Sequence, residues 1–407
     1  MIFARGILMN KQTICMKDLF KFKKSLWILS FAVFLPYFAS GMIAAFIMVW
    51  LRELGASFID VGLINTVSNL VLASSFFIGG ILSDNYGGKP IFFLGLFLTF
   101  LSSLIYGIAA WLPIWFLVGL GLIFGRIAIG FRESSSFQII YETSEKHKKG
   151  SSFGLLSTFR QLGYIIGPII GGLIAYFFGL KAPFILAPFI ILMAIPLIIK
   201  IGLKENKSTN LSISSSFKEI RKLLNLSSGV SILIFLSLWD QFFLEIGNPF
   251  YMIFLNEEFN APPYMLGLCF TVMSLSTFVF SMVGGISSDL IGKRKPLITL
   301  GTLLMALSVG LVAFAFNPWM FVASYFIAGV STAISNTAIP SYFADVLKER
   351  ASTIFGFKFT LMYFAGGIAP LISGWIIQVF NSLRLPFIIN FIGLIIEIFL
   401  LIIFFKE

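Results

Sequence analysis

Twelve apolar segments, each about as long as a membrane is thick, follow one another along this chain. We place them at about 26–50, 59–82, 91–111, 114–140, 153–178, 184–202, 229–255, 264–287, 297–316, 319–343, 354–379 and 386–405. A bilayer span takes about 20 apolar residues, and lipid requires each span to satisfy its own backbone hydrogen bonds as a helix. Only 12% of the 407 residues are charged, about half of what soluble domains carry. The sequence therefore predicts an all-α, multi-pass membrane protein with twelve transmembrane helices.

A polar segment separates the first six spans from the last six, and short motifs recur across it. The sequence GGILSD at Gly79–Asp84 returns as GGISSD at Gly284–Asp289, 205 positions later, and Pro168 is matched by Pro370, 202 positions later. Two halves repeated in parallel predict two six-helix bundles with a binding site between them near the midplane. The predicted parts are a cytoplasmic N-terminal segment (1–25), the two bundles (26–202 and 229–407) and a cytoplasmic linker (203–228).

The basic residues predict the orientation. With both termini in the cytoplasm, 22 of the 29 Lys and Arg residues fall in cytoplasmic segments, three fall outside, and four lie within spans. Such a bias follows the positive-inside rule. The first apolar segment is full length and lacks a cleavage site, which predicts a retained span and not a signal peptide. We expect a cell-membrane protein with both termini in the cytoplasm, whose net charge of +11 reflects its loops and not a nucleic-acid partner.

The fifth span has an unusual glycine pattern, GLLSTFRQLGYIIGPIIGG. Glycines spaced by four share one helix face and let another backbone approach closely. A proline inside the span removes one hydrogen bond and predicts a kink, which lipid tolerates only against protein or a water-filled cavity. The predicted helix-packing motif comprises Gly154, Gly163, Gly167, Pro168, Gly171 and Gly172.

The spacing of this motif resembles, at every position, the fifth-helix motif of the drug:proton antiporters of the major facilitator superfamily. The stretches GILSDNYGGK from Gly80 and GISSDLIGKRK from Gly285 resemble two copies of the superfamily's signature loop. Arg126-x3-Gly130 resembles its fourth-helix motif. Asn85 stands where the signature often has arginine, so the first loop is less basic than usual. The resemblance implies a transporter that works by alternating access, and the fifth-helix motif favours export.

The two signature loops predict a cytoplasmic gate. An acidic group at a helix end can cap the exposed amides of another helix. The resemblance implies that Asp84 caps span eleven and Asp289 caps span five. We also expect Lys89, Lys293 and Arg294 to pair across the gate with Glu142 and Asp345. The alternative is that these are solvated loop charges. The predicted gate comprises Gly80, Asp84, Gly87, Lys89, Gly285, Asp289, Gly292 and Arg294.

Ionisable residues inside spans are costly, and they mark candidate functional positions. Glu133 follows Arg126 by seven residues and shares its helix face. Asp240 and Glu245 lie about 140° apart around span seven, so they need not share an environment. The resemblance implies that spans one, four, seven and ten line the cavity, which brings Arg126 and Asp240 together with Asn336 of span ten. Asp240 is the first candidate for the proton carrier, and the alternative is a salt bridge that fixes helix packing.

The sequence lacks a GxxxxGK[ST] loop, which disfavours an ATP-driven pump. No paired catalytic groups indicate an enzyme, and two cysteines and one histidine predict no metal or cofactor site. We expect a monomeric secondary transporter that exports an amphiphilic or drug-like compound or metabolite against protons. An importer of a sugar or organic acid with protons, or a membrane receptor that does not transport, remains an alternative. The excess of acidic over basic groups expected in the cavity favours a cationic or neutral amphiphile.

Overall fold

The computed structural model describes residues 24–143, 149–199, 228–291, 294–347 and 361–405. Within these ranges the chain is helical and contains no strand, which confirms the predicted all-α class. The predicted linker 203–228 lies outside the described residues except for its last residue, and so does nearly all of the N-terminal segment 1–25.

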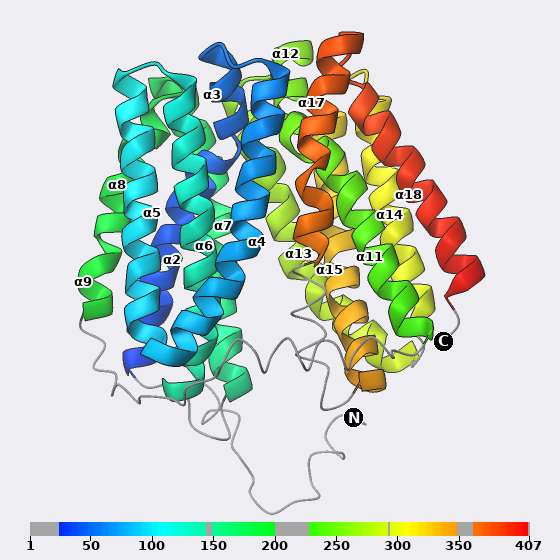
Figure 1. Cartoon of the computed structure of the whole chain (residues 1–407), viewed down its shortest axis with the longest axis horizontal. Coiled ribbons are helices and arrows are strands. Elements are labelled where there is room, and N and C mark those ends of the chain that lie inside the picture. Colours follow the sequence, from blue (N-terminus) through cyan, green and yellow to red (C-terminus); the bar gives the residue numbers. More distant parts are fainter. Residues whose placement is uncertain (1–23, 144–148, 200–227, 292–293, 348–360, 406–407) are drawn as a thin grey trace, which may run out of the picture.

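The helices of the N-terminal half run back and forth through one bundle, drawn in blue to green in Figure 1. They are α2 (Lys24–Ala44), α3 (Ile47–Glu53), α4 (Phe58–Tyr86), α5 (Gly88–Trp111), α6 (Trp115–Thr143), α7 (Lys149–Phe178), α8 (Ala182–Leu192) and α9 (Ala194–Ile199). Spans two to five are single helices, as predicted. The first span is broken between α2 and α3, where the sequence predicts one continuous segment. The sixth is broken near Met193 because Pro196 cannot donate a hydrogen bond to Leu192.

The C-terminal half forms the second bundle. Its elements are α11 (Ser228–Gly247), the short 3₁₀-helix η1 (Asn248–Phe250), α12 (Tyr251–Phe259), α13 (Pro263–Ile291), α14 (Lys295–Ala313), α15 (Trp319–Leu347), α17 (Ala369–Phe380) and α18 (Leu385–Phe404). The sequence Gly247-Asn248-Pro249 predicts a break in span seven, and η1 interrupts the span there. Pro249 lacks the N–H that would continue the helix from Glu245.

Eleven helices in the described part of the chain are long and apolar enough to cross a membrane. The shorter apolar stretch Ala182–Leu197 supplies the sixth span. Large apolar side chains cover the outer surface, as expected where a protein faces lipid: Trp111, Phe178 and Phe316 are 80%, 78% and 84% exposed. The fold is a twelve-span membrane bundle in two repeated halves.

The two halves meet through one contact that is made twice. A Cβ on Gly62 of α4 would overlap the carbonyl oxygen of Pro370 in α17, and a Cβ on Gly267 of α13 would overlap that of Pro168 in α7. These residues are related by the same offsets of 205 and 202 positions as the repeated motifs. The repeat in sequence is therefore also a repeat in packing, with α4 against α17 and α13 against α7.

These contacts lie toward one end of the molecule. We call the end that carries α3 and α12 the far side, and the opposite end, where α2 begins and α18 ends, the terminal side. Figure 1 shows the ribbons of the two halves converging at the far side and diverging toward the terminal side. The largest apolar cluster also joins the halves near the far side, since it includes Phe46 and Trp50 together with Phe254 and Leu266. Packing in this structure therefore closes the far side.

An ion pair adds to this closure. Arg52 of α3 donates through Nε to Oε1 of Glu257 in α12 at 2.8 Å. Its Nη1 also donates to the Ala56 carbonyl at 2.7 Å, and its guanidinium lies 3.7 Å from the centre of the Phe58 ring. Both charged side chains remain partly exposed, at 24% and 32%. The pair therefore links the halves at a site that water reaches.

Candidate functional site

A cavity of about 330 Å³ lies mostly within the N-terminal half and is closed by parts of the other half. Helices α2 to α8 of the first half contribute to its wall, and so do η1, α12, α13 and α15 of the second. Its polar lining residues are Ser40, Asn65, Thr99, Ser102, Ser103, Tyr106, Arg126, Arg132, Tyr164, Asn248 and Tyr325. Pockets that bind small molecules are of this size and mostly apolar with a few polar groups. The cavity is the candidate binding site.

Arg126 lines this cavity, as the sequence predicts. It is positioned by α6, and its Nε is buried without a hydrogen-bond partner in the described part of the chain. The positive charge of Arg126 acts on Glu245 of α11 and on the hydroxyl of Tyr363, so it reaches toward the other half. A guanidinium here is available to a bound molecule.

Arg132 of α6 also lines the cavity. Its side chain packs over Gly95 of α5, leaving the residue only 2% exposed. The guanidinium lies 5.0 Å from the centre of the Tyr37 ring. Its Nε and Nη1 have no hydrogen-bond partner among the described residues. The expected excess of acidic groups in the cavity is thus wrong: both charged lining residues in the described chain are arginines.

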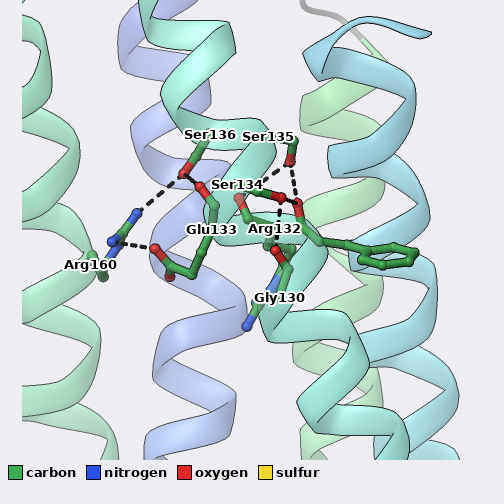
Figure 2. A network of polar contacts seen from close by, with 8 residues as sticks. Gly130, Arg132, Glu133, Ser134, Ser135, Ser136 and Arg160 are labelled. Carbon is green, nitrogen blue, oxygen red and sulfur yellow. Dashed lines mark hydrogen bonds and ion pairs between the residues drawn. The ribbon is translucent and has the colours of Figure 1, made fainter. Parts of the chain in front are cut away.

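Glu133 is not paired with Arg126, although the two share a predicted helix face. Its Oε2 instead lies 2.7 Å from Nη1 of Arg160 on α7, whose Nη2 donates to Ser136 Oγ at 3.4 Å. Figure 2 shows Arg160 reaching from α7 to Glu133 and Ser136 on α6. The Glu133 carboxylate is therefore paired within the N-terminal bundle with Arg160, a partner that the sequence does not predict.

Glu245 is held at the boundary between the halves. Three side-chain amides donate to its carboxylate: Asn69 to Oε2 at 2.9 Å, Gln241 to Oε1 at 3.1 Å and Asn248 to Oε1 at 3.2 Å. Asn69 comes from α4, so this hydrogen bond crosses from one half to the other. Asn248 also lines the cavity, and thereby connects it to Glu245. Asn248 follows Glu245 by three residues at the junction of α11 and η1, a spacing that makes their side chains neighbours.

Asp240 lies away from this cavity and from Glu245. Its negative charge acts on Glu397 of α18, which is 5% exposed and has a buried Oε2 without a hydrogen-bond partner in the described chain. Neither Asp240 nor Asn336 is among the described residues that line the cavity, and Asn336 is exposed. This cavity therefore does not bring Arg126, Asp240 and Asn336 together, and their meeting on facing walls stays a prediction. The rotation of α11 turns Asp240 toward α18 and Glu245 toward the other half.

The described residues of the predicted gate lie at the ends of their helices on the terminal side. The backbones of Asp84 and Asp289 belong to the last turns of α4 and α13, but their side chains are outside the described residues, as is Gly292. Lys89 lies in the first turn of α5, and Arg294 precedes α14. The helix-capping roles of the two aspartates stay predictions.

The glycines of the gate differ from one another. Gly87 joins α4 to α5 with φ of 90°, a conformation that favours glycine. Gly80 and Gly285 have nothing within 4 Å of an added Cβ. Their neighbours Gly79 and Gly284 do make close contacts, with Gly130 on α6 and Ala333 on α15. Close packing between helices therefore explains why Gly79 and Gly284 are glycines, but it does not explain Gly80 and Gly285.

The glycine face of α7 packs as predicted. A Cβ on Gly163 would lie 2.8 Å from the Phe38 backbone nitrogen, and one on Gly167 would lie 3.1 Å from Gly41 of α2. Gly171 continues this face, while Gly172 and the carbonyl group of Pro168 face α13 of the other half. Gly154 has nothing within 4 Å and makes no such contact. The helix is continuous through Pro168.

Two sets of site residues are not predicted from the sequence. Asn69 is neutral and so lacks the cost that marks an ionisable residue within a span, although its i,i+4 spacing from Asn65 indicates a polar face on α4. Arg160 and Arg132 are charged residues within spans, but nothing in one sequence shows which helix each side chain meets.

Comparison with known proteins gives the same architecture. The model of the Major Facilitator Superfamily matches residues 29–244 and 230–407. The quinolone resistance protein NorA of Staphylococcus aureus is 24% identical over 88% of this chain and 90% of its own length. The multi-drug resistance efflux pump PmrA of Streptococcus pneumoniae is 27% identical over 86% of this chain and 88% of its own length.

Solved structures share the fold at lower identity. A nucleoside transporter, NupG, superposes with a TM-score of 0.79 over 94% of this chain and all of its own, at 13% identity. A POT family transporter in complex with 5-aminolevulinic acid gives a TM-score of 0.71 over 93% and 94%, at 16% identity. With a family model that matches both halves and a fold shared with these transporters, the chain belongs to the Major Facilitator Superfamily.

Proposed function

We propose that this protein exports amphiphilic small molecules across the cell membrane in exchange for protons, with both termini in the cytoplasm. Family membership supports transport. Two relatives bear the names of a quinolone resistance protein and a multi-drug efflux pump, which favours export. The excess of basic residues in the loops of the terminal side supports its cytoplasmic location.

The hydrogen bond from Asn69 to Glu245 is the observation that carries proton coupling. An ionised carboxylate accepts strong, charge-assisted hydrogen bonds. Protonation removes the charge and turns one acceptor oxygen into a donor, so the bond across the halves weakens. A proton on Glu245 therefore favours separation of the halves at the far side.

This behaviour meets the main requirement of an exchanger. Exchange needs a carrier that stays locked when it holds neither proton nor substrate, because an empty carrier that reorients dissipates the gradient. Ionised Glu245 bound by Asn69 supplies such a lock. Asn248 lines the cavity and donates to the same carboxylate, so a bound substrate and a bound proton act on one group.

Asp240 is a weaker candidate for the proton carrier. It faces Glu397 within the C-terminal bundle, and a proton held there is not at the boundary between the halves. The structure corresponds to the state closed at the far side, since the paired glycine contacts and the Arg52–Glu257 ion pair all lie there. With the terminal side in the cytoplasm, this is the inward-facing state of the transport cycle.

Purified protein in liposomes tests the proposal with a fluorescent quinolone as the probe. A proton exchanger accumulates the probe when the liposome interior is acidic, and a protonophore abolishes the accumulation. Protein-free liposomes under the same gradient correct for passive trapping. Accumulation only with an acidic exterior would establish proton-linked import instead. Binding without movement under either gradient would favour the receptor alternative.

A further inference from the structure

The cavity wall formed by α6 carries two arginines, and neither forms a direct ion pair or hydrogen bond among the described residues. Among the described residues, neither Arg126 nor Arg132 has an ion-pair partner or a hydrogen-bond partner for its buried Nε. Arg132 is 2% exposed, and its Nη1 is also buried without a partner. Both side chains line the same cavity of about 330 Å³.

The nearby carboxylates are already bound to other groups. The charge of Glu133 is balanced by its ion pair with Arg160. Glu245 accepts from three neutral amides, and its charge acts on Arg126 without a direct ion pair. One carboxylate for two arginines leaves an excess of positive charge. No Asp or Glu is among the described residues that line the cavity. The wall is therefore electropositive, and this charge faces the space in which a ligand would sit.

A buried charge without a partner is expensive to keep. Within membrane spans, such charges mark substrate or ion pathways. Arginine is also the side chain best suited to planar, bidentate recognition of carboxylates. The excess positive charge of the two arginines is best explained by a ligand that brings a negative charge.

The rest of the wall determines what accompanies that charge. Apolar side chains from both halves line the cavity, among them Ile43, Met48 and Phe270. Hydroxyl groups from Ser102 and Tyr164 add neutral polar contacts. This lining suits an apolar body with few polar groups.

We propose that the cavity binds amphiphilic organic acids, with the carboxylate on the Arg126–Arg132 wall and the apolar body against the facing helices. The inference rests on the proposed function for its claim that this ligand is the transported substrate. An organic acid replaces the cationic or neutral amphiphile that the sequence favoured. The sequence predicted an excess of acidic groups in the cavity, whereas the charged residues that line it are arginines.

Three probes with one apolar body test the charge preference: 2-naphthylacetate, 2-naphthylacetamide and 2-naphthylethylamine. Binding to the purified full-length protein is measured by calorimetry, without any gradient. The acid is expected to bind about ten- to a hundredfold more tightly than the amide, as charge-assisted hydrogen bonds predict. The amine is expected to bind most weakly.

Two variants locate the preference, Arg126→Gln and Arg132→Gln. Each is expected to reduce the acid-to-amide ratio while amide binding persists. Arg384→Gln is the matched control, because Arg384 pairs with Glu258 outside the cavity and its side chain is 36% exposed. Comparison of the three probes on the unmodified protein does not depend on how the variants fold.

Equal binding of acid and amide, a preference for the amine, or no binding of any probe would overturn the inference. An acid preference that survives both arginine substitutions would also overturn it. Failure of gradient-driven transport with intact acid binding would instead count against the proposed exchange. The two claims therefore fail separately.

Discussion

Replacing Gly267 by alanine should open the far side of the transporter. The new methyl group would overlap the Pro168 carbonyl oxygen and lie 3.2 Å from the Gly172 Cα, so both neighbours belong to the backbone of α7 and cannot rotate away. Overpacking of this kind costs about 1–3 kcal/mol. Alanine also stabilises a helix by about 0.5–1 kcal/mol over glycine, but it does so in both states and leaves their ratio unchanged.

The expected shift toward the open far side is therefore about 5- to 150-fold. Gly62→Ala should produce the same shift through Pro370, because the two contacts are copies in the two halves. Additivity holds for distant sites, so the double variant should approach the product of the single effects.

Thiol labelling measures this shift. A cysteine at Ser40, which lines the cavity, should react with a membrane-impermeant reagent added at the far side only when that side opens. The native Cys15 and Cys269 are first replaced by serine. Gly154→Ala is the control, since nothing lies within 4 Å of its added methyl group. Labelling at the unmodified rate in both interface variants would refute the reasoning.

Three further predictions follow from other contacts. Glu257→Gln should shift the same labelling by at most about fivefold, because a partly exposed ion pair with Arg52 contributes about 0–1 kcal/mol; a larger shift than that of the glycine variants would contradict this ranking. Gly163→Leu should abolish transport while the protein still reaches the membrane fraction, since a large side chain would separate α7 from α2; full transport activity would show that this contact is dispensable. Asp84→Asn and Asp289→Asn should each increase labelling of the cavity from the terminal side, and unchanged labelling in both would remove the gate role.

Much of the fold was readable from the sequence because lipid leaves few alternatives. Apolar length fixed the spans, and the repeated motifs predicted two equivalent bundles. Proline positions predicted the break at Pro249, where a missing N–H interrupts the helix. The spacing of Gly163 and Gly167 predicted a close helix contact, and the structure supplies α2 as the partner.

The site was less predictable because it depends on how each helix is rotated. Asp240 and Glu245 lie on one helix, and the sequence placed them about 140° apart without showing which one faces the other half. Glu133 shares a helix face with Arg126 on α6, yet its carboxylate forms an ion pair with Arg160 of α7. Pairing between helices depends on packing angles and side-chain direction, which local spacing does not encode.

The most direct test of the account is transport by Glu245→Gln. Glutamine keeps the shape and can still accept hydrogen bonds, but it cannot take up a proton. The account predicts that this variant loses accumulation driven by a pH gradient while it still exchanges labelled for unlabelled substrate between equal pools. Asp240→Asn serves as the comparison and should retain driven accumulation. Gradient-driven accumulation at the unmodified rate in Glu245→Gln would contradict the central claim.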